Sequence, residues 1–266
     1  MKVAIAGFGA IGKKVAMLLD AGIEGLELVA VSARNHDKAR GNMAALSRKV
    51  PVVSGGELAA MADVVVDCVP KEAFMEIAEP ALKAGCLLVT VSGAAILANP
   101  EIIDQAKSSD GRIILATGAL LGLDAVRAAA EGEIHSVRMI TRKPPFSLAG
   151  APYLIEHNIA IDDLSEPLKV FEGTAREGAA GFPANVNVAA ALGLAGIGVD
   201  ETRLEIWADP ALDRNTHTIH VEADSARFSL SIENVPTEEN PGTGKITALS
   251  VVAALRGLVS PLRVGS

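Results

Sequence analysis

The stretch "KVAIAGFGAIG" (residues 2–12) places an apolar run directly before glycines at positions 7, 9 and 12. The apolar run predicts a buried strand, and the G-x-G-x-x-G spacing predicts a tight turn that opens a helix. Glycine permits the turn, lets the backbone approach a pyrophosphate closely, and packs the helix tightly on the strand. The N–H groups at the start of the helix then face the phosphates. The stretch therefore predicts a dinucleotide site formed by Gly7, Gly9, Ala10, Ile11 and Gly12.

Further apolar runs alternate with helix candidates through the first 118 residues. Runs of Val, Ile and Leu without polar alternation are typical of strands covered on both faces. Before one helix candidate, Asn99 is expected to cap and Pro100 to take the first helical position. Repeated βα units of this length predict a Rossmann-type, doubly wound parallel sheet over residues 1–118. The runs are 26–32, 50–53, 63–69, 86–92 and 112–118, and the helix candidates are 11–21, 71–85 and 99–108.

The pattern changes in the second half of the chain. Runs at 202–207, 216–222 and 227–233 alternate with period two, which predicts strands with one covered and one polar face. We expect residues 119–240 to form a second α/β (α+β) domain, for catalysis and dimerisation, with a mixed or antiparallel sheet. Residues 241–266 are expected to return and complete the first domain. Helix candidates in this half are 172–181, 186–197 and the closing 244–259.

Composition narrows the function classes. The 266-residue chain has a formal net charge of −8 and a pI near 5.2, which argues against a nucleic-acid-binding protein. No apolar run reaches the length of a membrane span, and the N-terminus does not resemble a signal peptide, so we expect a soluble cytoplasmic protein without a membrane partner. Cys68 and Cys86 lack CxxC spacing and histidine neighbours, which favours two buried reduced thiols over a disulfide or a metal site.

The loops that follow the predicted strands indicate how the cofactor is held. The second strand ends in "VSARN" (31–35), which has no acidic residue for the adenosine ribose. Arg34 can stack on adenine and bind a 2′-phosphate, so we expect NAD or NADP, although a solvated loop arginine is the alternative. The loops 67–73 and 91–95 are expected to line the same crevice, with ordinary βα turns as the alternative. Their candidate cofactor ligands are Cys68, Pro70, Ser92 and Gly93.

Beyond the glycine motif, longer segments across nearly the whole chain resemble the L-aspartate dehydrogenase family, whose members combine a dinucleotide domain with an α/β catalytic domain. The middle segments are more diagnostic than the glycine motif, which many oxidoreductases share. The similar segments are "GFGAIG" (7–12), "TGALLGLDA" (117–125), "TRKPP" (141–145), "FEGTAREGAAGFPANVNVAAALGLAG" (171–196), "ADPALDRNTHTI" (208–219), "FSLSIENVP" (228–236) and "NPGTGKITALS" (240–250).

The resemblance implies oxidation of L-aspartate to iminoaspartate with NAD or NADP, or reductive amination of oxaloacetate with ammonia in reverse, as a supply for NAD biosynthesis. By matching the family motifs, it assigns cofactor contacts to Ala119 and Asn187 and catalysis to His217. Asn185, the first Asn of "NVN" (185–187), is taken as a substrate ligand. One departure is "NPGTG", where Gly242 and Gly244 replace the usual Lys and Ser, so the contacts of those side chains are left open, with Lys245 as the candidate replacement.

The residues themselves separate two nearby histidines, His217 and His220. Along a strand, side chains alternate between faces, so His217 shares a face with Ile219 and Val221, and His220 lies on the opposite face. An odd spacing on a strand points the two rings apart, and a third ligand is not evident at useful spacing, so no metal site is predicted. A histidine can move protons in both directions near neutral pH, as oxidation of an amine requires. A histidine on an apolar face is more often a core residue than a catalyst, but the position at the start of the strand beside a loop and the family resemblance together favour His217 as the catalytic residue.

A dicarboxylate substrate needs local positive charge in an acidic protein. Arg142 and Lys143 in "TRKPP" are the candidates, with Arg176 and Lys245 as less favoured ones. Arginine offers a bidentate fork for a carboxylate and is the preferred anchor of the two. The alternative is a basic pair at a surface strand end.

Together these features predict a two-domain dehydrogenase that binds cofactor and a dicarboxylate in a cleft between the domains and assembles as a homodimer. Similar two-domain reductases, such as those of the dihydrodipicolinate reductase and homoserine dehydrogenase types, remain alternatives. A protein that senses NAD(P) without turnover is a third possibility. The "HHxxK" run of the first type is missing from the sequence.

Overall fold

The computed structural model describes residues 1–183, 186–240 and 242–265. The chain folds into two compact units, which are described separately. Unit 1 comprises residues 1–118 and 247–264, and unit 2 comprises residues 119–246 together with Gly265. In the described part of the chain, none of the helices combines the length and the apolar character needed to cross a membrane.

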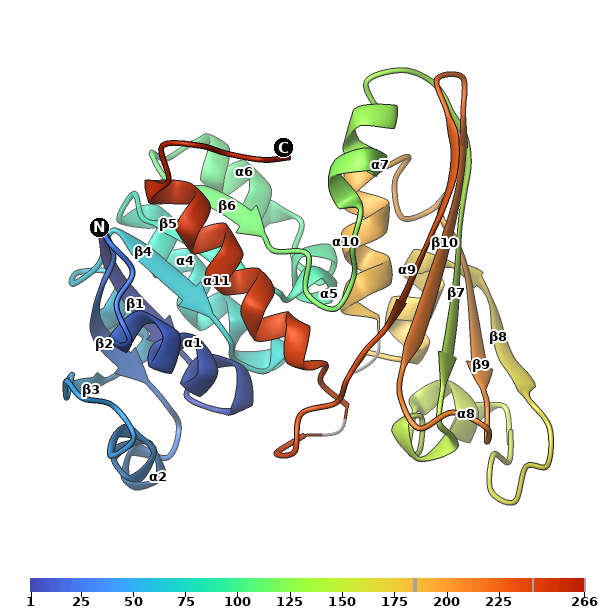
Figure 1. Ribbon diagram of the computed structural model, residues 1–266, viewed down its shortest axis with the longest axis horizontal. Coiled ribbons are helices and arrows are strands. Elements are labelled where there is room, and N and C mark those ends of the chain that lie inside the picture. Colours follow the sequence, from blue (N-terminus) through green and yellow to red (C-terminus); the bar gives the residue numbers. More distant parts are fainter. Residues whose placement is uncertain (184–185, 241, 266) are drawn as a thin grey trace. The chain divides into compact units, whose positions relative to one another are not determined.

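Unit 1 is built on a six-stranded parallel sheet with the strand order β3-β2-β1-β4-β5-β6 (Figure 1). This is the strand order of a doubly wound dinucleotide-binding fold, and it confirms the predicted fold class. The order reverses between β1 and β4, so the carboxyl ends of these two strands border the position where such sheets bind ligands. The strands are β1 (Lys2–Ala6), β2 (Glu27–Ser32), β3 (Val52–Val53), β4 (Val64–Asp67), β5 (Leu87–Thr90) and β6 (Arg112–Leu115).

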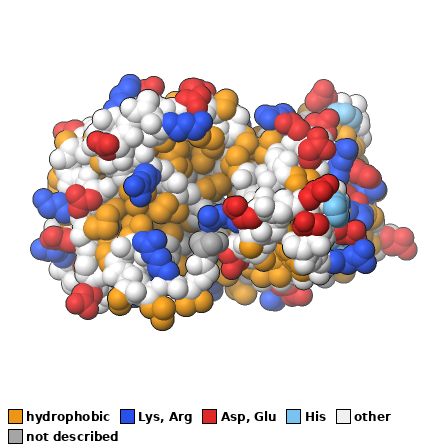
Figure 2. Space-filling view, turned by 90° about the horizontal axis from the view of Figure 1, so that it is seen from above, with side chains coloured by type: hydrophobic (Ala, Val, Ile, Leu, Met, Phe, Trp, Pro, Cys, Tyr) orange, Lys and Arg blue, Asp and Glu red, His pale blue; other side chains and the backbone are white. Residues whose placement is uncertain are grey.

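On the surface drawn in Figure 2, the Lys and Arg side chains are interspersed with Asp and Glu. The visible face therefore carries charge of both signs.

Alternating side chains of the strands form two cores in unit 1. Val3 and Ile5 of β1 point to one face of the sheet, and Ala4 and Ala6 point to the other, all of them fully buried. The first face is covered by α1 (Ala10–Asp20), α2 (His36–Met43) and α11 (Lys245–Val259). The second face is covered by α3 (Gly55–Leu58), α4 (Phe74–Lys83), α5 (Gly93–Ala98) and α6 (Glu101–Lys107), with the short 3₁₀ helix η1 (Lys71–Ala73) before α4.

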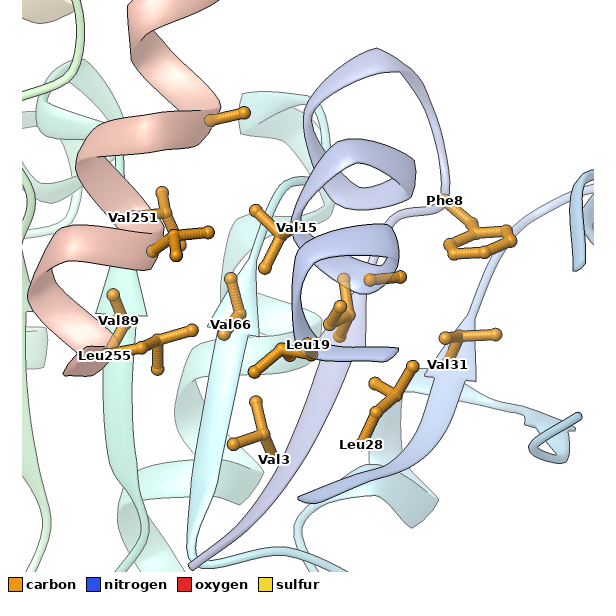
Figure 3. Packing of buried hydrophobic residues seen from close by; sticks show 14 of the residues in the cluster. Val3, Phe8, Val15, Leu19, Leu28, Val31, Val66, Val89, Val251 and Leu255 are labelled. Carbon is orange, nitrogen blue, oxygen red and sulfur yellow. The ribbon is translucent and has the colours of Figure 1, made fainter. Parts of the chain in front are cut away.

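Helix α11 comes from the end of the chain but packs against the first sheet. Val251 and Leu255 of α11 are fully buried and lie near Val15 of α1 and Val66 and Val89 of the sheet (Figure 3). The closing helix predicted at 244–259 thus forms, and its apolar face becomes part of the unit 1 core.

Unit 2 contains a five-stranded mixed sheet with the order β11-β10-β7-β9-β8. Only β7 and β9 run parallel within it. Helices α7, α9 and α10 lie along one face of this sheet (Figure 1). The strands are β7 (Ile134–Lys143), β8 (Leu168–Thr174), β9 (Arg203–Ala208), β10 (Thr216–Ala223) and β11 (Arg227–Glu233). The helices are α7 (Leu123–Ala129), the 3₁₀ helix η2 (Pro145–Ser147), α8 (Pro152–Glu156), α9 (Ala175–Gly181) and α10 (Asn187–Ala195).

Three local features differ from the sequence expectations. Residues 172–174 belong to β8, and the helix predicted from 172 begins at Ala175, where Thr174 and Glu177 form a capping box. Strand β8 escaped detection because a register shift between Lys169 and Phe171 breaks its alternation. Asn99 does not cap the helix after it: its amide donates to the carbonyl of Ala95 in the preceding helix, and Pro100 takes the N-cap position.

Candidate active site

The glycine loop after β1 matches the demands of a dinucleotide cradle. Gly7 has a φ of +87°, and a Cβ placed on it would lie 2.5 Å from the carbonyl oxygen of Cys68. A Cβ on Gly12 would lie 1.9 Å from the carbonyl oxygen of Gly7, so helix α1 packs directly on the loop. A Cβ on Gly9, in contrast, meets no described atom within 4 Å. The first and third glycines are required by the protein's own packing, and the second leaves space for a ligand.

Helix α1 offers that space an electropositive end. Gly9 is the N-cap, and the first turn, which begins Ala10–Ile11–Gly12, contains no acidic residue. The N–H groups of a first turn have no carbonyl partner within their own helix and carry the positive end of the helix dipole. The space over Gly9 and the charge at this helix end therefore fit the pyrophosphate of NAD or NADP.

The end of β2 lies beside the glycine loop, because the N–H of Gly7 donates to the carbonyl of Ser32 at 2.9 Å. Ser32 is buried, and Arg34 is exposed. Asn35 accepts a hydrogen bond from the N–H of Lys38 and so caps α2. Arg34 thus stands at the sheet edge where an adenosine 2′-phosphate is bound in this type of fold.

A buried carboxyl group that the sequence reasoning missed organises the ends of β4 and β5. Asp67 accepts hydrogen bonds from the hydroxyls of Thr90 at 2.6 Å and Ser92 at 2.8 Å, and from the N–H of Val69 at 3.0 Å. Burial raises the pKa of Asp67, while these hydrogen bonds oppose the shift. The hydroxyl of Ser92, predicted to touch the cofactor, is therefore directed to Asp67. The position of an acidic residue at the end of a buried strand was the available signal.

The other residues predicted from these two loops lie close by in sequence but differ in exposure. Cys68 is half-buried, its side chain packs against the core of unit 1, and burial raises the pKa of its thiol well above the ordinary value. Pro70 is exposed at the start of η1, and Gly93 is buried in the first turn of α5. Cys68 and Cys86 are both free thiols.

In unit 2, His217 lies on the covered face of β10, as strand parity predicts. It is 3% exposed, and its Nδ1 lies 3.1 Å from Oγ1 of Thr141 on the neighbouring strand β7. Burial, together with the charge of Lys143, lowers the pKa of His217 to about 3. The imidazole is therefore neutral at physiological pH. His220 is on the opposite face, where its Nδ1 lies 2.8 Å from the hydroxyl of Ser229.

Lys143 lies on the same face of the sheet as His217. It follows Thr141 by two residues on β7, and it is only 4% exposed. Burial lowers the pKa of Lys143 to about 8. The site therefore combines a neutral imidazole with an ammonium group that loses its proton slightly above neutral pH.

Arg142 lies on the opposite face of β7 from Lys143. Its guanidinium lies 3.3 Å from a carboxylate oxygen of Asp209 and 4.7 Å from the centre of the Trp207 ring. Because neighbouring residues on a strand point to opposite faces, Arg142 and Lys143 cannot both project beside His217. The geometry favours Lys143 as the carboxylate ligand, although the sequence analysis preferred the arginine.

Two asparagines complete the polar part of the covered face. Asn215 and Asn234 are directly opposite on adjacent chain segments, with the N–H of Asn234 donating to the carbonyl of Asn215 at 2.8 Å. Their side chains are 8% and 3% exposed. Nδ2 of Asn234 donates to the carbonyl of Ala119, a predicted cofactor contact. Sequence reasoning missed both asparagines, although Asn215 comes two residues before His217.

Three further positions singled out in the sequence are Asn187, Asn185 and Gly244. Asn187 is exposed at the first position of α10. Asn185 lies outside the described residues. At Gly244, a Cβ would lie 2.7 Å from Oδ1 of Asn234. Within the described ranges, the structure brings together no group of three or more His, Cys, Asp or Glu side chains suited to a metal ion.

Comparisons with known proteins match both halves of the chain. Residues 124–258 match the model of the aspartate dehydrogenase C-terminal domain, and residues 7–116 match the homoserine dehydrogenase NAD-binding domain. The chain is 55% identical over 266 residues to an L-aspartate dehydrogenase of Bradyrhizobium diazoefficiens, covering 100% of this chain and 94% of the relative.

Solved structures give the same result for the fold. The crystal structure of aspartate dehydrogenase from Thermotoga maritima superposes with a TM-score of 0.75 at 27% identity, covering 100% of this chain and 99% of that one. A homoserine dehydrogenase from Thiobacillus denitrificans has a TM-score of 0.63 at 16% identity, covering 97% and 73%, which shows a shared fold. The match of the catalytic half and the full-length identity distinguish between these relatives: the chain belongs to the L-aspartate dehydrogenase family.

Proposed function

We propose that this protein oxidises L-aspartate to iminoaspartate with NAD or NADP, and in reverse aminates oxaloacetate with ammonia. It is an oxidoreductase that acts on the CH–NH₂ group of its donor. The observation that carries the proposal is the 55% identity along the full chain to an L-aspartate dehydrogenase. The buried pair of His217 and Lys143 on one sheet face supports it, because the reaction needs a proton-transfer group and a cation for a carboxylate.

In this proposal the two units have different binding roles. Unit 1 binds the cofactor through Gly7, Gly9 and the first turn of α1, with Arg34 at the adenosine end and the Cys68, Pro70 and Ser92–Gly93 loops around it. Unit 2 binds the substrate and contributes Ala119 and Asn187 to the cofactor. The bound nicotinamide supplies the hydride acceptor.

In this proposal His217 accepts the proton that the substrate nitrogen loses. Oxidation requires that the ammonium group of aspartate lose a proton before the Cα–H bond breaks. In the tautomer that carries its proton on Nδ1, the ring donates to Oγ1 of Thr141 and leaves Nε2 as the proton acceptor. A bound dicarboxylate offsets the charge of Lys143 and raises the pKa of His217 from its low value, which makes the ring a stronger base when substrate is present.

Lys143 binds a substrate carboxylate as an ammonium ion. Burial lowers the pKa of Lys143, and an anion bound beside its ammonium group would raise that pKa again, so the site favours an anionic ligand. Arg142, held by Asp209 on the other face, does not take this role.

The biological setting forms the last part of the proposal. Iminoaspartate is a reactive product that serves NAD biosynthesis, and the enzyme acts in the cytoplasm, where its two free thiols stay reduced. A homodimer is supported by α10, an Ala- and Gly-rich helix on which Leu194 is 41% exposed. Light scattering coupled to gel filtration measures the assembly state.

The activity is tested with purified protein, NAD or NADP, and a panel of aspartate, glutamate, alanine and homoserine. Absorbance of the reduced nicotinamide should rise with aspartate far faster than with the others. Equal rates with alanine and glutamate, or turnover of homoserine alone, would contradict the substrate assignment. Cofactor binding without turnover of any amino acid would indicate a sensor.

A further inference from the structure

Two buried amide oxygens in unit 2 have no hydrogen-bond partner among the described residues: Oδ1 of Asn215 and Oδ1 of Asn234. Both side chains are more than nine-tenths buried. A buried acceptor without a donor destabilises the folded protein, and such groups in native structures call for an explanation. Two of them on facing residues indicate a site that is built for a ligand rather than for the fold.

The orientation of the Asn234 amide follows from its other bond. Its Nδ2 donates to the carbonyl of Ala119 at 3.0 Å, and an amide oxygen has no hydrogen with which it could make this bond instead. The unpartnered atom of Asn234 is therefore the oxygen. The oxygen is itself buried, and a Cβ at Gly244 would lie 2.7 Å from it.

The two oxygens belong to the same face as the predicted catalytic residue. Asn215 precedes His217 by two residues along the same run, which places their Cα atoms about 7 Å apart on one face. Extending the β7–β10 register by one residue sets Asn215 opposite Lys143. The covered face thus carries a hydrogen-bond donor, the ammonium group of Lys143, and two acceptors, the amide oxygens of Asn215 and Asn234.

A donor group and two acceptor groups on one face can distinguish the carboxylate of an amino acid from its amino group. A carboxylate or a keto oxygen carries lone pairs and is repelled by an amide oxygen, while an amine carries N–H donors. We propose that Asn215 and Asn234 form the amino-group subsite, in which their Oδ1 atoms accept N–H bonds from the substrate nitrogen or from ammonia beside His217. The proposal rests on the proposed function, because it assigns a place to the nitrogen of that reaction.

The subsite also orients ammonia for the reverse reaction. Ammonia has three N–H bonds and one lone pair. When two N–H bonds are accepted by the two oxygens, the lone pair stays available to attack the carbonyl carbon of the keto acid. Two acceptors also select an amine over a hydroxyl group, which has a single hydrogen to donate.

The experiment measures KM for ammonia and for oxaloacetate separately, at saturating reduced cofactor. Asn215→Leu and Asn234→Leu should each raise the ammonia KM by about tenfold or more and change the oxaloacetate KM by less than about twofold. Gly244→Ala, which places a methyl group 2.7 Å from the Asn234 oxygen, should raise the ammonia KM in the same way. Asn215→Asp keeps the acceptor and should stay within about threefold of the wild type.

Thr218→Val is the matched control. Thr218 lies on β10 but on the opposite face, bonded to Ser231 at 3.2 Å, so neither KM should move. Equal increases in both KM values, or an unchanged ammonia KM in the leucine variants, would overturn the proposal. If a leucine variant does not fold, Gly244→Ala, which should raise the ammonia KM, is compared with Asn215→Asp, which should stay near the wild type.

A binding measurement separates this inference from the proposed function. Calorimetry with the reduced cofactor present compares aspartate with succinate, which lacks the amine and is not turned over. The wild type should prefer aspartate, and Asn215→Leu should lose that preference. A wild type that prefers aspartate without oxidising it would refute the activity and keep the subsite. A wild type that oxidises aspartate with no preference over succinate would refute the subsite alone.

Discussion

At the scale of single residues, the environment of each side chain assigns its chemistry. His217 and His220 are three positions apart, yet one is buried against Thr141 and the other lies on the opposite face beside Ser229. Lys143 and Arg142 are adjacent, yet one joins His217 and the other pairs with Asp209. In both pairs the alternation of a strand separates groups that the sequence places together.

Replacing the two histidines separately tests their roles. His217→Gln should lower kcat for aspartate oxidation by about 10²–10⁴-fold, the usual contribution of a general acid–base group. His220→Gln should leave kcat within about twofold. Cofactor affinity, measured by quenching or calorimetry, should be unchanged in both. A larger loss of kcat in the His220 variant would contradict the assignment.

Burial of neutral His217 predicts a loss of stability in acid. Its folded pKa of about 3 is below the unfolded value near 6.5, so unfolding takes up a proton. The stabilisation is present above pH 6.5 and is lost as the pH falls from there toward 3. Between pH 7 and pH 5 the residue should account for roughly 2 kcal/mol of lost unfolding free energy.

Urea unfolding followed by fluorescence measures this effect, because Trp207, the single tryptophan, reports on unit 2. His217→Gln cannot titrate and should show a smaller decrease between the two pH values, while His220→Gln should behave as the wild type. An identical decrease in all three proteins would exclude His217 as the source.

The buried Lys143 predicts a pH limit for ligand binding. Its pKa of about 8 means that the free enzyme loses this cation as the pH rises above 8. Succinate affinity should therefore fall by up to about tenfold per pH unit between pH 8 and pH 10. Lys143→Gln should bind succinate weakly at all pH values and show no such slope, whereas Arg142→Gln should retain it.

At the scale of elements, the strand–loop–helix unit of β1 and α1 carries two separate constraints. Any side chain at position 12 would collide with the carbonyl oxygen of Gly7. A Cβ at position 9 would meet no described atom within 4 Å. The same motif therefore contains one glycine needed for folding and one needed for the ligand.

Alanine at each glycine distinguishes these constraints. Gly12→Ala should lower Tm, since its Cβ collides with backbone, and cofactor binding should be lost with the loop geometry. Gly9→Ala should leave Tm nearly unchanged and raise the cofactor Kd by about tenfold or more, because the Cβ enters the space of the pyrophosphate. A Gly9 variant with normal cofactor affinity would refute the proposed cradle.

At the scale of the whole molecule, the chain leaves unit 1 at residue 118 and returns to it at 247. Helix α11 fills the face of the first sheet beside α1, so the dinucleotide fold is completed by the last part of the chain.

Truncating a buried side chain of α11 leaves a cavity and should lower the stability of unit 1. This effect is expected although α11 is far from the glycine loop in sequence. Leu255→Ala should cost about 2–5 kcal/mol, as buried leucine truncations do, and lower Tm with a matching loss of cofactor binding. Leu249→Ala, on the same helix but 46% exposed, should cost less than about 1 kcal/mol. Equal effects of the two changes would show that α11 does not support this core.

The sequence by itself determined the parallel sheet of unit 1, the glycine cradle and the separation of His217 from His220. Each depends on a local period or spacing that any chain with those residues must follow. Strand β7 and the bulged β8 were not anticipated, because their charged residues and broken alternation are balanced only by partners elsewhere, such as Glu205 for Arg138.

Only the tertiary structure decided that the Ser92 hydroxyl donates to Asp67 and that Lys143 rather than Arg142 shares the face of His217. It also decided that the Oδ1 atoms of Asn215 and Asn234 are buried on this face without a hydrogen-bond partner among the described residues. Those facts depend on which strands are neighbours and in which register they pair, and long-range pairing leaves no mark in the spacing of residues along the chain.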